Sequence, residues 1–360
     1  MLTDRDVARW RLATQRLVAP HHGSVLDVVT GLLAVQAENR GQSGWSVASR
    51  TSGRTAGELD ELLAEGAVVR THVLRPTWHY VAAADVDWLL RLTAPRNRPV
   101  FERQLADLGL TSAVLDRAGV VVLEHLATEP DRDRTELAAV VAAHGIALTG
   151  HAFMLFLGLL ELDRLIVSGR ERGTTHTYAR YADRVVAPSR FDREEALAEL
   201  AWRYLGGHGP ATERDLAYWA TLTLTDARRA IAASRHRLAS FEHDGRTFWH
   251  DPAGAPPSGE EQEPAGHLLL LLDEIYRGYQ DSRMVLDVAG IVPRGRETAI
   301  GIALVGGQIV GSMRRTLGST VRFDVEAYRP LGPVELAALE AAAARYASYL
   351  DLPPVLTVRS

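Results

Sequence analysis

The chain has 360 residues, which is too long for one ordinary domain of about 100–150 residues and suggests two to four domains. Hydrophobic residues make up 46 % of it and charged residues 24 %, as in an ordinary globular protein, and the absence of cysteine excludes disulfides, thiolate zinc sites and sulfur redox chemistry. The net charge of −5 does not exclude a nucleic-acid partner, because binding depends on where basic residues are gathered.

No segment has the pattern of a membrane or export signal. The first residues, "MLTDRDVARWRL", lack the apolar core of a signal peptide. The apolar run in "LLLLLDEIY" is interrupted by Asp273 and Glu274 too soon for a membrane span. We therefore expect a cytoplasmic protein with no membrane partner.

A polar pair stands at the end of the first strongly apolar pattern. A predicted helix begins after Ser24, and its apolar stripe next reaches Gln36, where the helical period calls for an aliphatic side chain. Glu38 follows, just before Asn39 and Gly41, which are helix-ending residues. A continuing helix would put Gln36 and Glu38 about 200° apart, whereas a helix that ends near Gln36 lets both side chains point the same way. A hydrogen-bonded amide beside a solvated carboxylate is the structural alternative.

One arrangement recurs three times: helices, then two β-branched runs joined by a polar turn, which is typical of a winged helix. The first copy combines "DRDVARWRLATQRL", the helix before Gln36 and "AGELDELLAEGAVVRTHVLRPTWHYVAAA". The second has a helix capped by Thr135, the helix "LTGHAFMLFLGLLELDRL" and the hairpin "LIVSGRERGTTHTYARY". The third begins near Asp192, with helices in "REEALAELAWRYL", "TERDLAYWA" and "TLTDARRAIAASRHRL" before a hairpin with an Asp-Gly turn.

The last part of the chain has a different composition. The Pro- and Gly-rich stretch "DPAGAPPSGEEQEPAG" is typical of a linker or long loop, and short β-like runs with an Ala-rich terminal helix follow it. We therefore predict an α+β fold with tandem winged-helix domains and a C-terminal β-barrel-like domain, which is either a small barrel or a sheet closed by the terminal helix. The expected domains are residues 1–125, which include the polar pair, 126–190, 191–255 and 266–360.

Arginines in turns and at strand ends are candidate DNA contacts. Arg170 and Arg172 lie in the turn of the second hairpin, and Arg314 and Arg315 follow a strand in the C-terminal part. Solvated turn residues are the alternative for each of them. Three tandem winged helices favour the DNA interpretation.

A strand-like segment near the polar pair adds two further candidates. In "RTHVLRPTWHYV", strand alternation puts Arg75, Thr77 and His79 on one face, and we predict that Arg75 and His79 contact DNA. A structural histidine is the alternative for His79, and Trp78 is expected in the core.

Motifs for metals, phosphates and acyl transfer are missing from the sequence. The 13 histidines form neither HExxH nor HxE…CxxC, and no carboxylate cluster has ligand spacing. No GxGxxG, GxxxxGKS or GxSxG motif occurs. We expect neither a metal nor another cofactor.

The pair of Gln36 and Glu38 is suited to one kind of bond cleavage. A carboxylate stabilises a developing oxocarbenium ion or activates water, and an amide positions that water. A glycosidic bond to an already cationic base needs no general acid, because the leaving group departs neutral.

The chain resembles the winged-helix DNA glycosylases of the AlkZ/YcaQ type over nearly its whole length. The resemblance is carried by "LLAVQAEN", "VVRTHVLRPTWHYVAAADVDWLLRLTAPR", "GRERGTTHTYARYADRVV", "HGPATERDLAYWATLT", "LLDEIYRGYQDSR" and "GGQIVGSMRRTL". It implies tandem winged helices and a β-barrel around a DNA channel. It also implies metal-free excision of alkylated purines, including bulky adducts and the crosslinks made by antibiotic genotoxins, as in antibiotic self-resistance.

The catalytic motif of that family is Gln–aliphatic–Gln, or Gln–aliphatic–Asp in another branch, and this chain has Gln36–Ala37–Glu38. The first position matches, whereas Glu38 keeps the carboxylate of the second branch on a stem one methylene longer. The resemblance therefore implies Gln36 and Glu38 as the catalytic residues, while the longer stem bears on rate and lesion preference.

Three functions remain open at this point. The first is a monofunctional glycosylase that acts as a monomer on alkylated double-stranded DNA, at the nucleoid. The second is a winged-helix DNA-binding protein or regulator without catalysis, and the third is a protein-interaction scaffold. The polar pair favours the first over the second, and the turn arginines favour either over the third.

Overall fold

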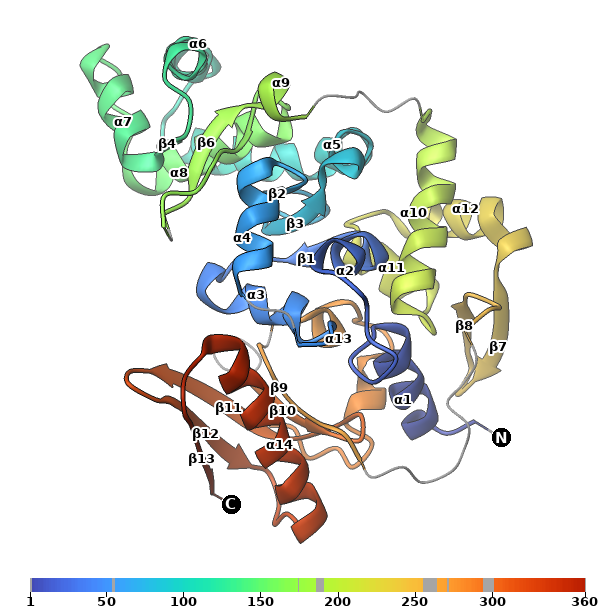
Figure 1. The fold of residues 1–360 in the computed structure, drawn as a ribbon. Helices are drawn as coiled ribbons and strands as arrows, with labels where there is room; N and C mark the ends of the chain where they lie inside the picture. The colour runs from blue at the N-terminus through green and yellow to red at the C-terminus, as the bar shows by residue number, and fades with distance from the viewer. Residues whose placement is uncertain are drawn as a thin grey trace.

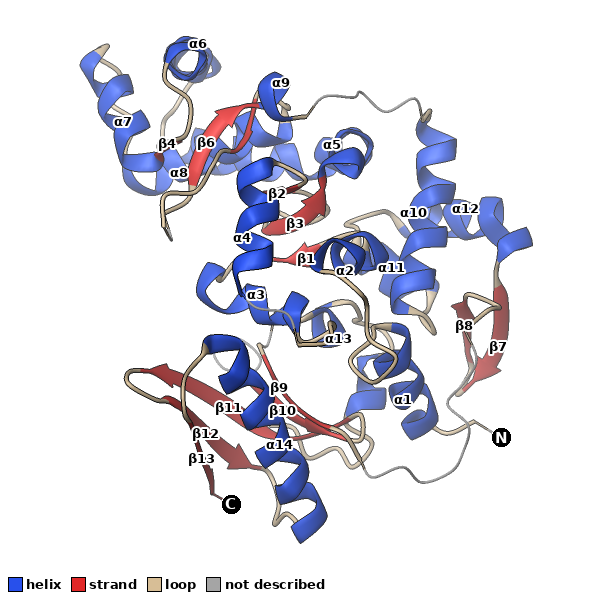
Figure 2. Cartoon of the chain, viewed as in Figure 1, coloured by secondary structure: helices blue, strands red, loops and turns tan. Residues whose placement is uncertain are grey.

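The computed structural model describes residues 2–53, 56–173, 175–185, 191–254, 264–270, 272–293 and 301–359. Helices and strands alternate along the chain in successive units, with the first unit at the centre of the view and the others around it (Figure 1; Figure 2). The first helix, α1 (Asp4–Thr14), begins with a capping box at Thr3 and packs against the C-terminal part. None of the described helices is both long and apolar enough to cross a membrane.

The central unit holds the polar pair on a short strand. Its helix α2 ends at Leu32, because Leu33 has a φ of 66° that no helix continues through. Of the two alternatives that the sequence left open, the helix ends before Gln36, which lies on a strand, and Asn39 takes the N-cap position of the next helix. The elements of this unit are α2 (Val25–Leu32), β1 (Val35–Gln36), α3 (Arg40–Ala48), α4 (Ala56–Glu65), β2 (Val68–His72) and β3 (Trp78–Ala82).

A long helix, α5 (Ala83–Asp107), leads to the second unit. Helix α6 (Ser112–Thr128) crosses the expected boundary between residues 125 and 126 and packs with the two helices that follow it. Asp133 caps the helix whose start we assigned to Thr135, because its carboxylate accepts from two backbone N–H groups. The remaining elements are β4 (Arg132–Asp133), α7 (Arg134–Ala143), α8 (Gly150–Leu162), β5 (Ile166–Ser168), β6 (Thr177–Arg180) and α9 (Tyr181–Arg184).

The third unit follows the predicted order of helices and hairpin. Asp244 and Gly245 both have positive φ, at 49° and 68°, as the predicted tight Asp-Gly turn requires. Ala211 bridges to Trp249 and takes the place that a first strand has in the other units. The elements are α10 (Arg193–His208), α11 (Glu213–Trp219), α12 (Leu224–Ser234), the 3-10 turn η1 (Arg235–Arg237), β7 (Ala239–His243) and β8 (Arg246–His250).

The three units share one topology. In the first two, a short strand precedes the second helix, and the sheet orders are β1-β3-β2 and β4-β6-β5, all antiparallel. The last strand of each hairpin is therefore central. In the first unit, this pairing attaches the polar pair of β1 directly to β3.

The C-terminal unit is an open sheet. Its strands are ordered β13-β12-β11-β10-β9, and among the described residues its two edge strands do not pair. Of the two expected forms, the described residues therefore form no closed barrel but a sheet with the terminal helix against it. Helix α14 packs across the sheet, so the sheet has an apolar core although it does not close into a barrel (Figure 1). Strand β13 then pairs parallel to β12. The elements are β9 (Gly266–Leu269), α13 (Glu274–Arg277), the 3-10 turn η2 (Arg283–Leu286), β10 (Gly301–Val305), β11 (Gln308–Leu317), β12 (Val321–Ala327), α14 (Pro333–Leu350) and β13 (Pro354–Arg359).

Continuous apolar cores join these units. One cluster runs from the sheet of the first unit through α5 to the helices of the third unit, and includes Tyr279 from the segment after α13. A second joins α1 and β8 to the C-terminal sheet and α14. The segment 272–286, which contains α13, therefore packs where the first, third and C-terminal units meet.

Candidate active site

The polar pair lies on and just after β1. Gln36 is paired with His79 of β3 and is 5 % exposed, whereas the side chain of Glu38 is exposed. Both side chains line the same cleft and Ala37 between them does not, as the alternation of an extended chain predicts. The Glu38 carboxylate accepts a hydrogen bond from the backbone N–H of Trp78, at 3.2 Å, which holds it beside the strand.

An open cleft of about 670 Å³ contains both members of the pair. Gln36 and Glu38 form one wall, and the loop that begins at Arg75 lies beside them. The other walls come from the end of α11, with Tyr218, and from α13, with Arg277. The cleft therefore combines residues of the first unit, the third unit and the segment 272–286.

The backbone and side chain of Gln36 are held from two sides. Its backbone N–H donates to Glu274 Oε1 at 2.9 Å, and its side-chain oxygen accepts from Arg75 Nη2 at 3.3 Å. Among the described residues, the amide nitrogen of Gln36 has no hydrogen-bond partner. That nitrogen is therefore available to a substrate or a water molecule in the cleft.

Arg75 is a nearly buried bridge and not a surface residue. Besides Gln36, it donates to the carbonyl oxygen of Arg277 at 2.9 Å and to Nε2 of His79 at 3.3 Å. Nδ1 of His79 lies 2.9 Å from the carbonyl oxygen of Thr77, so Nδ1 donates there and Nε2 accepts. Burial, together with the charge of Arg75, lowers the pKa of His79 to about 3, which keeps its ring neutral. His79 is fully buried and holds Arg75 in place.

The buried carboxylate of Glu274 ties this site together. It accepts from the backbone N–H of Gln36, from Nε1 of Trp219 at 2.9 Å and from Nε2 of His208 at 3.3 Å. Burial by itself raises the pKa of Glu274, but the hydrogen bond from His208 and the charges of Arg75 and His208 outweigh burial and lower the pKa to about 2. Glu274 is therefore ionised and fully hydrogen-bonded inside the protein.

Sequence reasoning missed the role of Glu274. The signal was present, because Asp273 and Glu274 interrupt an apolar run that is otherwise suited to burial. Two acids at the end of such a run must find partners when they are buried. Asp273 finds Arg50, at 2.7 Å, and Glu274 finds the site described above.

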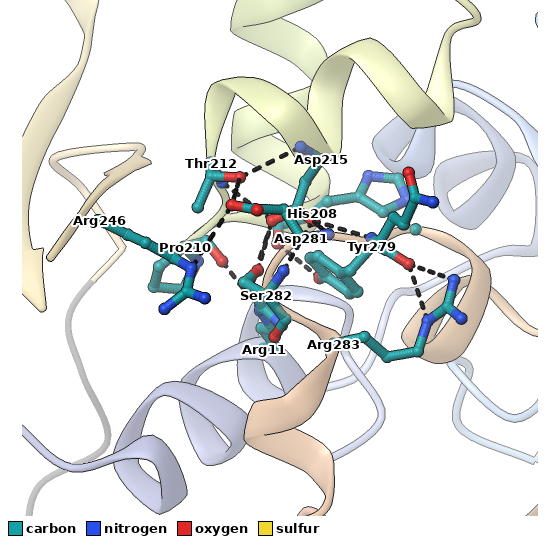
Figure 3. Close-up of polar contacts among 12 residues, drawn as sticks. Arg11, His208, Pro210, Thr212, Asp215, Arg246, Tyr279, Asp281, Ser282 and Arg283 are labelled. Atoms are coloured by element: carbon teal, nitrogen blue, oxygen red, sulfur yellow. Dashed lines mark hydrogen bonds and ion pairs between the residues drawn. The ribbon is translucent and has the colours of Figure 1, made fainter. Parts of the chain in front are cut away.

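A second buried network fixes the chain that follows α13 against α11 (Figure 3). Asp215 Oδ1 accepts three backbone N–H groups of residues 280–282, at 2.8 to 3.2 Å. Arg11 of α1 donates to the carbonyl oxygens of Pro210 and Ser282. The side chain of Arg283, directly after this clamp, is held by the carbonyl oxygen of Tyr279 at 2.9 Å.

The structure does not bring the remaining arginine candidates into the cleft. Arg170 is exposed in the hairpin turn of the second unit, and Arg172 forms ion pairs with Asp133 and Glu136 of its own unit. Arg314 is exposed beside an open groove on the C-terminal sheet.

Arg315 points to the other side of β11 and ties the C-terminal unit to the central one. Its guanidinium donates to the hydroxyl of Tyr346 at 2.9 Å and to the carbonyl oxygen of Gly41 at 2.8 Å. Gly41 belongs to α3, which starts two residues after Glu38. This contact braces the strand and loop that carry the polar pair.

Comparisons with known proteins give a family match and a similar fold. A family model described as AlkZ-like DNA glycosylase matches residues 29–349. The structure is similar to that of the DNA glycosylase AlkZ of Streptomyces sahachiroi, with a TM-score of 0.78 and 20 % sequence identity over 99 % of this chain and 100 % of that one. The comparison with curated proteins gave no match.

Proposed function

Because the chain belongs to the family of AlkZ-like DNA glycosylases, we propose that it excises cationic N-alkylated purines from double-stranded DNA, with Gln36 and Glu38 as the catalytic residues. The observation that carries this proposal is the position of these two residues on one wall of one cleft, with the amide nitrogen of Gln36 free. In this proposal the enzyme acts as a monomer, at the nucleoid, and bulky adducts and crosslinks are among its substrates.

The proposed reaction breaks the bond between the sugar C1′ and the purine nitrogen. The cationic base takes the electron pair of that bond and leaves neutral, while the exposed carboxylate of Glu38 stabilises the positive charge that develops on the sugar. Gln36 orients a water molecule, whose oxygen bonds to C1′ and whose proton passes to Glu38 or to solvent. The product is an abasic site in an intact strand.

Incubation with N7-alkylguanine DNA, followed by alkaline cleavage, tests the proposal directly. Strand breaks that appear only after alkali indicate excision that leaves an abasic site. Binding to this DNA without excision would instead support the non-catalytic DNA-binding function.

The absence of lysine predicts how the reaction ends. All 40 basic residues other than histidine are arginine, so no lysine amine is present to form a Schiff base with the sugar. We expect no borohydride-trapped protein–DNA adduct and no strand nick. We also expect slow excision of uracil, because no acid protonates a neutral leaving base. A trapped adduct, or uracil excision at a rate comparable to that of N7-alkylguanine, would contradict this mechanism.

The proposed DNA-binding surface uses the three units as winged helices, within the four domains expected from the sequence. Arg170 supports it, because this side chain is exposed at the hairpin turn. Arg172 is already engaged by Asp133 and Glu136, so its charge is partly compensated within the protein. Arg314 is also an exposed candidate for this surface.

The two turn arginines are expected to differ in their effect on DNA affinity. Arg170→Gln should weaken binding to any duplex and reduce the slope of log affinity against log salt by roughly 1 unit, the loss of one phosphate contact. Arg172→Gln should change the slope less, because its internal carboxylates already balance it. Fluorescence anisotropy across a salt series measures both, and an unchanged slope for Arg170→Gln would return this residue to the solvated-turn interpretation.

A further inference from the structure

Tyr218, in the wall of the cleft, lies among three arginines, two of which line the cleft with it. The guanidinium carbons of Arg75 and Arg283 lie 5.7 Å and 5.8 Å from the ring centre of Tyr218. Nη2 of Arg283 is 3.5 Å from the Tyr218 hydroxyl, and Arg277 lines the cleft together with Tyr218. Arg75 and two arginines of the segment 272–286 therefore place three cationic groups near Tyr218. Arg75, Arg277 and Tyr218 line the cleft that holds Gln36 and Glu38.

These charges have little internal compensation. In the described part of the chain, no carboxylate lies within ion-pair distance of the three guanidinium groups, although Glu274 acts on Arg75 from the interior. The Nε atoms of Arg75 and Arg277 are buried without a hydrogen-bond partner, and Arg75 is only 9 % exposed. A buried donor without an acceptor costs free energy, and a bound anion would remove that cost.

The same charges change the pKa of the Tyr218 hydroxyl. Burial by itself raises the pKa of Tyr218, but the charges of Arg75 and Arg283 and the hydrogen bond from Arg277 outweigh burial and lower the pKa below its ordinary value. A more acidic hydroxyl is a better hydrogen-bond donor to an anion.

The protein holds this wall rigidly. Asp215 belongs to α11, the helix that carries Tyr218, and its clamp on residues 280–282 fixes the position of Arg283 relative to that helix (Figure 3). Arg75 is held by Arg277 and His79. The donors are therefore oriented before any ligand arrives, which lowers the entropy lost on binding.

We propose that Arg75, Arg277 and Arg283, with the hydroxyl of Tyr218, bind one phosphate group of the DNA strand next to the nucleotide whose base is excised. This inference rests on the proposed function and names the part of the substrate that this wall recognises. The phosphate is attached to the same sugar whose C1′ must reach Glu38, so a phosphate held at this wall sets the position of C1′. Arg75 also holds the amide oxygen of Gln36, so it links the bound phosphate to the catalytic amide.

The test removes either the negative charge of a DNA phosphate or the positive charge of Arg277. Duplexes carry a tetrahydrofuran abasic-site analogue, with a neutral methylphosphonate in place of one flanking phosphate at a time, and binding is measured by anisotropy. Wild type should lose roughly tenfold in affinity when one particular phosphate is neutralised, the typical worth of a charged hydrogen bond. Arg277→Gln should lose a similar factor on unmodified DNA and nothing further on that methylphosphonate duplex. The proposal is overturned if, at every flanking phosphate, Arg277→Gln and the methylphosphonate lower the affinity independently, so that their fold-losses multiply.

Two variants guard against indirect effects. Arg329→Gln removes an exposed arginine that pairs with Glu335 in the C-terminal unit, and should bind all duplexes in the same order as wild type. Tyr218→Phe removes only the hydroxyl, and should show the same non-additivity with a smaller loss. If Arg277→Gln does not fold, Tyr218→Phe carries the test, and a fully additive loss in that variant also overturns the proposal.

The assay separates this inference from the proposed function. Binding to the abasic-site analogue needs no excision, so an inactive wild type with one phosphate-specific loss contradicts the glycosylase and retains the phosphate site. Normal excision with no phosphate-specific loss of affinity would support the glycosylase and overturn the phosphate site.

Discussion

Glu38→Ala is expected to lower the single-turnover rate of N7-alkylguanine excision by on the order of 10²-fold or more. The substitution removes the carboxylate that stabilises the charge on the sugar and accepts the proton of water. Glu38→Gln should retain measurable excision, because the resemblance implies Gln at this position in one branch of the family. The ratio of the excision rates of these two variants, compared between lesions, shows how the longer stem of Glu38 bears on lesion preference.

Stability and binding supply the controls for this prediction. Glu38 is exposed and accepts one hydrogen bond from the backbone of Trp78, so its removal should change the melting temperature little. Affinity for DNA with an abasic-site analogue should also stay close to that of wild type. An Ala variant that excises as fast as wild type would remove Glu38 from the mechanism.

Glu274→Ala is expected to destabilise the protein by about 3–5 kcal/mol and to abolish excision. The substitution leaves the N–H groups of Gln36 and Trp219 without an acceptor inside the protein. It also frees β1, so that Gln36 loses its orientation in the cleft. Chemical denaturation measures the stability, and excision is assayed under conditions in which the variant remains folded.

The pH dependence of stability reports on the same carboxylate. The pKa of Glu274 is lowered in the folded protein from about 4.5 to about 2, so its contribution to stability is fully present above pH 4.5. That contribution is lost as the pH falls from about 4.5 towards 2. Glu274→Gln should therefore show a shallower loss of stability than wild type across this range.

A matched carboxylate on the surface provides the control. Glu102 pairs with Arg98 on α5 while about half exposed, at 44 %, so Glu102→Gln should cost less than about 1 kcal/mol and leave excision intact. If Glu274→Gln matches Glu102→Gln in stability, pH profile and excision rate, the buried carboxylate does not position Gln36.

Local sequence determined most of the helices and hairpins. The predicted helices α8, α10, α11, α12 and α14 are present, because each has its own apolar period and most begin at a local cap. The Asp244–Gly245 turn was predicted for the same reason, since the geometry of a tight turn depends on its two central residues. The Asp133 cap was missed because Thr135, two residues later, is also a residue type that caps helices. Which of the two caps the helix depends on the backbone conformation.

The placement of Gln36 was open in the sequence and was decided by pairing between strands. An apolar period fits both a continuing helix and a helix that ends early, and the positive φ of Leu33 followed by pairing with β3 decided for the second. Closure of the C-terminal sheet could not be predicted either, because strand patterns indicate buried faces but not whether edge strands meet. Strand β13, unexpected from the sequence, pairs with β12 only after α14 has crossed the sheet.

The chemistry of the site depends most on contacts distant in sequence. The sequence alone supplied Gln36 and Glu38 as candidates, because an amide on an apolar stripe beside a carboxylate is visible within three residues. It also predicted DNA contacts for Arg75 and His79. Only the fold showed that His79 is fully buried and that Arg75, in the lining of the cleft, also bridges to Gln36. Glu274, 238 residues beyond Gln36, became part of the site only when the chain folded, because burial of its charge requires donors from three separate segments.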